Sequence, residues 1–181
     1  MSDEVHNSAI RVPDGGEVEA DPGSKYLITV QVEEQYEDKL DADALHRLAM
    51  SVLHAERKEG PLEVGVVVTT DDEVHALNKE YLGHDYQTDV ISFGMESEED
   101  FITPEERPEY LGDVVISYDR AAEQGPEYDH TTEQEVATLL IHGLLHLLGY
   151  DDIDDESRVR MHARQDELLG SSEFGRLNGD N

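Results

Sequence analysis

The stretch Thr131–Gly149, TTEQEVATLLIHGLLHLLG, decides the fold of this 181-residue chain. Its apolar residues surround the helical wheel almost completely, which predicts a central, buried helix from Thr131 to Leu148. Thr131 or Thr132 can cap the start of this helix, and Glu135 falls near the capping-box position. Gly149 is typical of a helix end. The sequence therefore predicts a fold organised around this one helix.

The other periodic segments alternate between strand and helix patterns. Runs rich in β-forming residues predict four strands, at residues 26–32, 62–70, 88–93 and 111–118. Apolar residues at helical spacing predict four further helices, at about residues 41–59, 71–81, 119–124 and 155–169. Together these elements indicate an α+β fold, or a mixed α/β sandwich, with a mixed sheet of about four strands and about five helices.

Composition divides the chain into three parts. Residues 1–24 are acidic and contain prolines and glycines with few large apolar residues, so we expect them to be disordered. Residues 25–170 carry all the predicted elements, and their number suits a single domain. Residues 171–181 are rich in Gly, Ser and Asn, and we expect a flexible tail there.

The chain has no cysteine. A disulfide and a thiolate metal site are therefore excluded, and a metal ion would have to bind to histidines and carboxylates. No apolar run approaches the roughly 18 residues of a membrane span, and the N-terminus lacks the basic start and apolar core of a secretory signal. We expect a cytoplasmic protein that does not enter membranes.

Acidic residues greatly outnumber basic ones, with 44 Asp and Glu against 13 Lys and Arg and a formal net charge of -31. At ordinary salt this charge should repel nucleic acid. One interpretation is an acidic protein that binds a basic partner. The other is a cytosol of very high salt, in which screening weakens the repulsion and carboxylates keep the surface hydrated. The acids are spread along the whole chain, which favours the second interpretation.

Two histidines on the central helix form a candidate metal site. His142 and His146 are four residues apart, so their side chains share one face of the helix. After Gly149 the chain turns back, and a ligand at Asp152 could close a three-point site with a fourth position left for water. This open arrangement is typical of a catalytic zinc ion. Alternatively, the histidines are hydrogen-bonded core residues, but their spacing and the carboxylates that follow favour a metal.

The pattern differs from the H-E-x-x-H helix of zinc proteases. Gly143 stands where that motif has its glutamate base, so this helix turn cannot supply a base. Activation of water would then depend on the metal, on Asp151 or on the substrate. This difference argues against peptide hydrolysis of the usual zinc-protease type.

Three segments together resemble the YbeY family. HGLLHLLGYDD at residues 142–152 is similar to the H-G-x-L-H-L-x-G-Y-D-H signature of that family. LNKEY at residues 77–81, followed by TDVISF at residues 88–93, resembles L-N-x-x-Y and T-D-V-L-S-F. LGDVVIS at residues 111–117 resembles L-G-D-I-x-I-S. The three motifs occur in the family's order, and the similarity covers most of residues 62–169.

The resemblance implies a bacterial endoribonuclease and rRNA-maturation factor that binds one Zn²⁺ per chain. Its expected activity is metal-dependent cleavage of single-stranded RNA in 16S rRNA 3′ end maturation and ribosome quality control. Ribosomal RNA, and ribosomal proteins or the small subunit, are the implied partners. Two other functions stay open: a ribosome assembly factor with a structural metal and little nuclease activity, and a metalloprotease-like hydrolase.

The resemblance also implies a set of metal ligands, His142, His146 and Asp152, around a metal-bound water. The family's third histidine falls at Asp152, and a carboxylate can also bind zinc. This replacement makes the site less positive and shifts its preference slightly towards harder ions such as Mn²⁺. Asp151 matches the family's own aspartate and is expected to be a neighbour of the site.

Further candidates lie in the other two motifs. The family often has an arginine where this chain has Leu82, and leucine cannot bind a phosphate. The expected substrate-side residues are Asn78, Lys79, His84, Thr88 and Asp89. Asp113 lies in an apolar strand, where a buried carboxylate needs a partner. It is expected to make either a hydrogen bond to a ligating histidine or an ordinary structural one.

Overall fold

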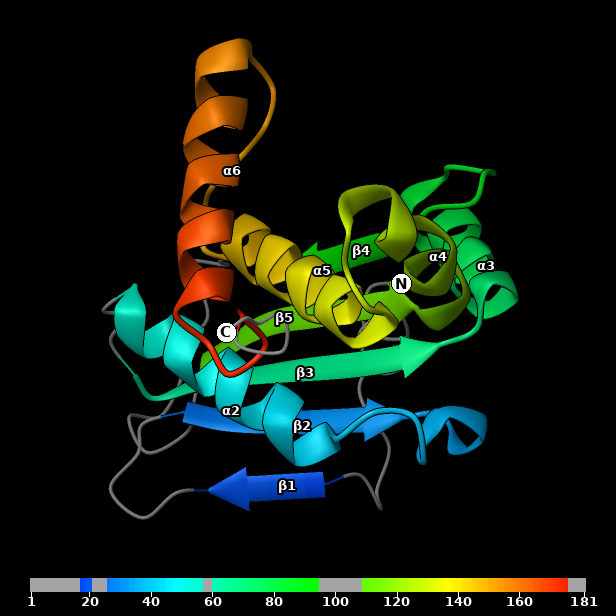
Figure 1. Cartoon of the computed structure of the whole chain (residues 1–181), viewed down its shortest axis with the longest axis horizontal. Helices are drawn as coiled ribbons and strands as arrows, with labels where there is room; N and C mark the ends of the chain where they lie inside the picture. Colours follow the sequence, from blue (N-terminus) through cyan, green and yellow to red (C-terminus); the bar gives the residue numbers. More distant parts are fainter. Residues whose placement is uncertain (1–16, 21–25, 57–59, 95–108, 176–181) are drawn as a thin grey trace, which may run out of the picture.

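The computed structural model describes residues 17–20, 26–56, 60–94 and 109–175. Within these ranges, five strands form one sheet in the order β1-β2-β3-β5-β4 (Figure 1). The strands are β1 (Glu17–Ala20), β2 (Tyr26–Val32), β3 (Leu62–Thr69), β4 (Val90–Gly94) and β5 (Glu109–Ser117). The helices are α2 (Ala42–Ala55), α3 (Asp71–Leu82), α4 (Tyr118–Gln124), α5 (Thr132–Leu147) and α6 (Asp155–Gly170), with short 3-10 helices η1 (Glu34–Tyr36) and η2 (Gly125–Tyr128).

The predicted α+β fold with a mixed sheet is confirmed. Strands β2, β3 and β5 run parallel, whereas β1 and β4 are antiparallel edge strands. The valine-rich β3 lies at the centre of the sheet, and Val64, Val66 and Val68 are fully buried. A strand between parallel neighbours is covered on both faces, which explains its nearly continuous apolar run.

Helices cover both faces of this sheet. Helices α2 and α5 pack on one face and share a large core with β2, β3 and β5. Helix α3 lies on the other face, over a small cluster that contains Val74, Ile91 and Val115. Side chains of β5 alternate between the faces, so that Val114 belongs to the large core and Val115 to the small one. Helix α6 contacts α5 and extends past the sheet (Figure 1). Within the described ranges, no helix is long and apolar enough to cross a membrane.

Strand β1 was not predicted. It lies inside the segment 1–24, which we expected to be disordered, and it pairs antiparallel with β2 from Glu17 opposite Val30. Backbone hydrogen bonds along the edge of β2 hold such a strand without an apolar pattern of its own, so its acidic sequence gave no signal. The rest of the segment lies outside the described residues.

Part of the expected flexible tail is also packed. Phe174 is buried against the large core, and its carbonyl oxygen accepts a hydrogen bond of 3.0 Å from Gln134 Nε2. The composition of residues 171–181 is mostly polar, and it therefore did not indicate that Phe174 would be buried. Residues 176–181 lie outside the described residues.

A capping box starts helix α5. The Thr131 hydroxyl accepts a hydrogen bond from the backbone N–H of Gln134, and Gln134 Oε1 accepts one from the backbone N–H of Thr131. The box residue is therefore Gln134, three positions after the cap, and the prediction of Glu135 was one residue too far. Glu135 is instead buried and binds partners outside its own helix.

Gly143 lets α5 approach the sheet closely. A Cβ atom at this residue would lie 2.6 Å from Val114 Cγ1 and 3.1 Å from Ser92 Oγ. The Ser92 hydroxyl donates a hydrogen bond of 3.1 Å to the Gly143 carbonyl oxygen. The glycine therefore has a packing role, and the turn between the two histidines is held against β4 and β5.

Candidate metal centre

The three predicted metal ligands come together at the C-terminal end of α5. One candidate ligand atom from each of His142, His146 and Asp152 lies within 4.8 Å of the other two. The two imidazole rings are 4.7 Å apart and nearly perpendicular, at 81°. Gly149, with φ of 106°, occupies the left-handed region, which allows the chain to turn after the helix and bring Asp152 back.

Each histidine is oriented by a hydrogen bond at Nδ1. His146 Nδ1 lies 3.1 Å from the carbonyl oxygen of Tyr150, and His142 Nδ1 lies 2.9 Å from Gln165 Oε1. A carbonyl oxygen only accepts, so both rings donate through Nδ1 and leave the Nε2 lone pair for an ion. This is the usual outer arrangement around a metal-binding histidine.

Burial also prepares His142 for metal binding. Desolvation lowers the pKa of His142, and the neighbouring His146 lowers it further. The hydrogen bond to Gln165 and the charges of Asp89 and Asp152 act in the opposite direction. A lower pKa keeps the imidazole neutral near neutral pH, which is the form that binds a metal. The imidazole nitrogens of His142 and His146 and the exposed carboxylate of Asp152 fit Zn²⁺ with one position open to solvent.

Asp113 does not orient either histidine through Nδ1, because Gln165 and Tyr150 occupy those positions. The carboxylate of Asp113 is buried on β5, where its backbone pairs with Gly65 and Phe93. The partners at Nδ1 are thus Gln165 and the Tyr150 carbonyl, neither of which was predicted, and the role of Asp113 stays a prediction. A signal for Gln165 exists: it lies between the buried Met161 and Leu168 at helical spacing, on the inner face of α6.

Asp151 is not one of the three residues whose ligand atoms cluster. Its Oδ1 accepts a hydrogen bond of 3.2 Å from the Ile153 backbone N–H, as in a turn closed by an aspartate. It lines a small cavity of about 320 Å³ together with Tyr150, Ser157 and Arg160. The structure thus gives Asp151 a local turn-forming role beside the site.

A larger cavity of about 490 Å³ adjoins the cluster of candidate ligands, and His142 belongs to both. Gln165, His162 and Asp166 of α6 lie on one side. The other residues that line it come from α4, η2, α5 and the loops next to β4 and α5: Asp89, Gln124, Tyr128, His130, Glu135, Thr138 and Leu139. Asp89 is the one substrate-side candidate from the sequence that lines this cavity. His130 was not predicted as a site residue, and Glu135 was predicted only as a capping residue.

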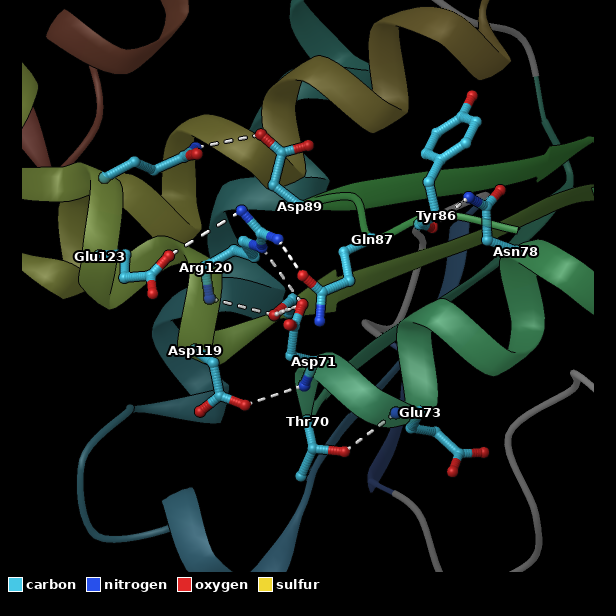
Figure 2. Close-up of polar contacts among 12 residues, drawn as sticks. Thr70, Asp71, Glu73, Asn78, Tyr86, Gln87, Asp89, Asp119, Arg120 and Glu123 are labelled. Atoms are coloured by element: carbon cyan, nitrogen blue, oxygen red, sulfur yellow. Dashed lines mark hydrogen bonds and ion pairs between the residues drawn. The ribbon is translucent and has the colours of Figure 1, made fainter. Parts of the chain in front are cut away.

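The other substrate-side candidates lie away from this cavity, at the end of α3 and the loop after it. Asn78 is buried, and its Nδ2 donates a hydrogen bond of 3.0 Å to the Tyr86 carbonyl oxygen (Figure 2). Lys79 is exposed and lies 3.8 Å from the Asp85 carboxylate. The ring of His84 stacks on that of Tyr86, with 5.3 Å between the centroids.

Leu82 and Thr88 lie in the same region, at the end of α3 and just before β4. Leu82 has 41% of its surface exposed. Thr88 is half-buried just before β4. The structure brings neither of them to the cavity that His142 lines. A role in substrate binding therefore stays a prediction for both these positions and those at the end of α3.

A polar network centred on Arg120 of α4 holds the loop that leads to Asp89 (Figure 2). Arg120 Nε lies 3.4 Å from Asp71 Oδ1, and Arg120 Nη2 donates a hydrogen bond to Gln87 Oε1. The backbone N–H of Asp71 donates in turn to Asp119 Oδ2 at 2.9 Å. These contacts connect the start of α3, α4 and the loop before β4. They therefore hold in place the loop that carries Asp89.

Fold and site together define a class of protein: a mixed-sheet α+β domain whose central helix carries two histidines beside a carboxylate and a polar cavity. A family model described as Endoribonuclease YbeY matches residues 30–173. The Endoribonuclease YbeY of Roseiflexus castenholzii is 40% identical over 149 residues, which cover 82% of this chain and 94% of that protein. That of an Exiguobacterium species is 45% identical over 139 residues, with 72% and 88% covered.

A solved structure shares the fold. The solution structure of TM1509 from Thermotoga maritima superposes with a TM-score of 0.55 and 27% sequence identity, and covers 79% of this chain and 87% of that one. The chain belongs to the YbeY family. The resemblance based on three sequence motifs is thereby confirmed.

Proposed function

We propose that this protein is a metal-dependent endoribonuclease that cleaves single-stranded RNA in 16S rRNA 3′ end maturation and ribosome quality control. The observation that carries the proposal is the cluster of His142, His146 and Asp152, with ligand atoms within 4.8 Å of one another, in a chain of the YbeY family. Ribosomal RNA is the proposed substrate. Ribosomal proteins or the small subunit are proposed partners, and the cytoplasm is the proposed compartment.

The donor set favours one Zn²⁺ per chain, with Mn²⁺ as the alternative. When bound, such an ion supplies Lewis acidity towards a phosphate oxygen or a water molecule. The protein's own residues prepare this chemistry: Gln165 and the Tyr150 carbonyl orient the histidines, and burial keeps His142 neutral. Asp152 is exposed, so an RNA strand can approach the site from its side.

The packing of α5 weighs against a protease. Gly143 cannot be replaced by a glutamate base without displacing Val114, so the mechanism of the H-E-x-x-H proteases is not available to this helix. An assembly factor with little nuclease activity is the second candidate. The observation that favours it is Leu82, an exposed apolar side chain where the resemblance implies an arginine.

Metal analysis and RNA cleavage test the proposal together. We expect about one zinc per wild-type chain by mass spectrometry in high salt, and a sharp loss in His146→Ala and Asp152→Ala. Asp151→Ala is the matched control, because it removes the adjacent carboxylate and should keep its metal. Cleavage of a single-stranded RNA oligonucleotide should stop with a chelator and return with added Zn²⁺ or Mn²⁺.

Each result has a clear consequence. A wild type purified without chelator that contains no metal would refute the metal site. A zinc-loaded wild type that leaves RNA intact would refute the nuclease and support the assembly factor. If Asp151→Ala loses the metal and Asp152→Ala keeps it, the third ligand is misassigned.

A further inference from the structure

A second polar pair lies in the wall of the cavity that His142 lines. His130, between η2 and α5, has its Nδ1 2.9 Å from Glu135 Oε1 of α5. The Glu135 side chain is almost fully buried, with 4% exposed, and that of His130 is 21% exposed. A buried carboxylate that holds one nitrogen of a histidine at a cavity wall is an arrangement that orients the ring for proton transfer.

Further hydrogen bonds fix Glu135 in this position. Gln124 Nε2 donates to Glu135 Oε2 at 2.8 Å, so both carboxylate oxygens have a partner. The same Nε2 atom donates to Asp89 Oδ2 at 3.0 Å. Such satisfied buried polar groups have little freedom to rearrange. Gln124 thus connects the pair to Asp89, which also lines the cavity.

The backbone holds His130 from the other side. Its N–H donates a hydrogen bond of 2.9 Å to the Gly125 carbonyl oxygen, which closes the turn around η2. The Tyr128 ring lies 6.4 Å from the His130 ring. Because Nδ1 donates to Glu135, the Nε2 atom of a neutral His130 carries the lone pair, on a ring that borders the cavity.

One face of α5 connects this pair with the metal cluster. Glu135, Thr138 and His142 follow one another at intervals of three and four residues, and all three line the cavity. Seven residues of α-helix rise about 10 Å, so the pair and the ligand lie about two turns apart. The reacting phosphodiester would therefore lie in the cavity between the two, within reach of both.

We propose that His130, oriented by Glu135, is a further catalytic residue for RNA cleavage; this inference rests on the proposed nuclease function. As the attacking hydroxyl oxygen forms its bond to phosphorus, His130 Nε2 takes the hydroxyl proton, and the bond from phosphorus to the leaving ribose oxygen breaks. The leaving oxygen takes a proton from water. His130 then releases its own proton to solvent, so protons balance over the reaction.

The charges around the pair suit this role. During the transfer His130 becomes an imidazolium, and the Glu135 carboxylate in contact with it offsets the new positive charge. Apart from this pair, the titratable side chains that border the cavity are Asp89, Tyr128, His142, His162 and Asp166. Gly143 leaves no room for a base on the turn between the proposed metal ligands. A base from a neighbouring element would supply the proton acceptor that this turn cannot.

The test uses the full-length, zinc-loaded protein at constant high salt. Single-turnover cleavage of a single-stranded RNA oligonucleotide is measured for the wild type, His130→Gln, Glu135→Gln and the control His54→Gln, together with RNA affinity and zinc content. His54 is an exposed histidine on α2 that lines neither cavity. We expect His130→Gln to lower the cleavage rate constant by about 10²–10⁴-fold, with zinc content and RNA affinity within about twofold of wild type.

Chemical rescue separates catalysis from structure. His130→Gly leaves a space at the cavity wall, and free imidazole should restore part of its cleavage rate, whereas Glu135→Gln should show a smaller loss and no rescue. An active wild type with an unaffected His130→Gln would overturn this inference alone. A slow His130→Gly that imidazole does not accelerate would also overturn it, in favour of a structural role. A zinc-loaded wild type that cleaves no RNA would overturn the nuclease function and this inference with it.

Discussion

Replacement of Gly143 by alanine should destabilise the protein, although alanine is the better helix former. In a helix interior this exchange gains about 1 kcal/mol from propensity alone. Here the new Cβ would lie 2.6 Å from Val114 Cγ1 and 3.1 Å from Val114 Cγ2. Val114 is fully buried on a central strand, and a β-branched side chain has few rotamers to escape into. The helix or the strand must therefore move.

The expected loss of stability is the cost of overpacking minus the gain in helix propensity. Overpacking of a filled core costs about 1–3 kcal/mol, and a contact this short on a rigid neighbour belongs at the upper end of that range. After subtraction of the propensity gain, we expect a net loss of about 2 kcal/mol, which corresponds to a fall in melting temperature of about 4–8 °C for a chain of this size.

Thermal and urea unfolding at constant high salt measure this loss. Gly170→Ala is the matched control: it also lies in a helix, at the end of α6, and a Cβ there would meet nothing within 4 Å. It should be neutral or slightly stabilising. In a double-mutant cycle, Val114→Ala removes both contacting methyl groups, so the cost of Gly143→Ala should shrink in that background. Unfolding of Gly143→Ala at or above the wild-type midpoint would refute the packing argument.

Three further predictions concern charge. Burial and the adjacent Asp119 raise the pKa of Tyr36 to about 12, above the unfolded value of about 10. The unfolded chain therefore loses this proton first, and stability should fall as pH rises from about 10 to 12; Tyr36→Phe should flatten that slope in urea titrations and remove a phenolate signal that appears near pH 12. Arg120→Ala should lower the unfolding free energy by about 1 kcal/mol and increase hydrogen exchange near Gln87, whereas unchanged exchange would contradict the network. RNA affinity of protein shown to be folded throughout should rise as salt screens the charge of -31, and affinity that only weakens would count against this.

The sequence predicted the parts of the site that depend on local spacing. His142 and His146 follow from helical geometry, and Gly149 indicated the turn that returns Asp152 to them. The same reasoning located the buried strands, because an apolar run without alternation indicates cover on both faces. Those features are fixed by neighbours in the chain, and a single sequence therefore contains them.

Features that depend on contacts distant in the chain were not predictable in the same way. Gln165 reaches His142 from another helix, 23 residues along the chain, and nothing in its own segment indicates a metal site. Asp113 was noticed because a carboxylate in an apolar strand is conspicuous, and the sequence left its partner open. Phe174 and β1 were missed for a related reason: each gains its stability from a surface that another element provides.

The packing at Gly143 connects these points to mechanism. In a zinc-protease helix the base stands on the turn between the two histidines, but here that turn lies against Val114 and has no space for a side chain. The helix can pack this closely against the sheet only because residue 143 has no side chain, so this position cannot carry a base. The proton acceptor must then come from the ion, the substrate or another element that reaches the same cavity. Of the described residues on the cavity wall, His130 has a buried carboxylate at its Nδ1, and the first turn of the helix that carries His142 and His146 supplies that carboxylate.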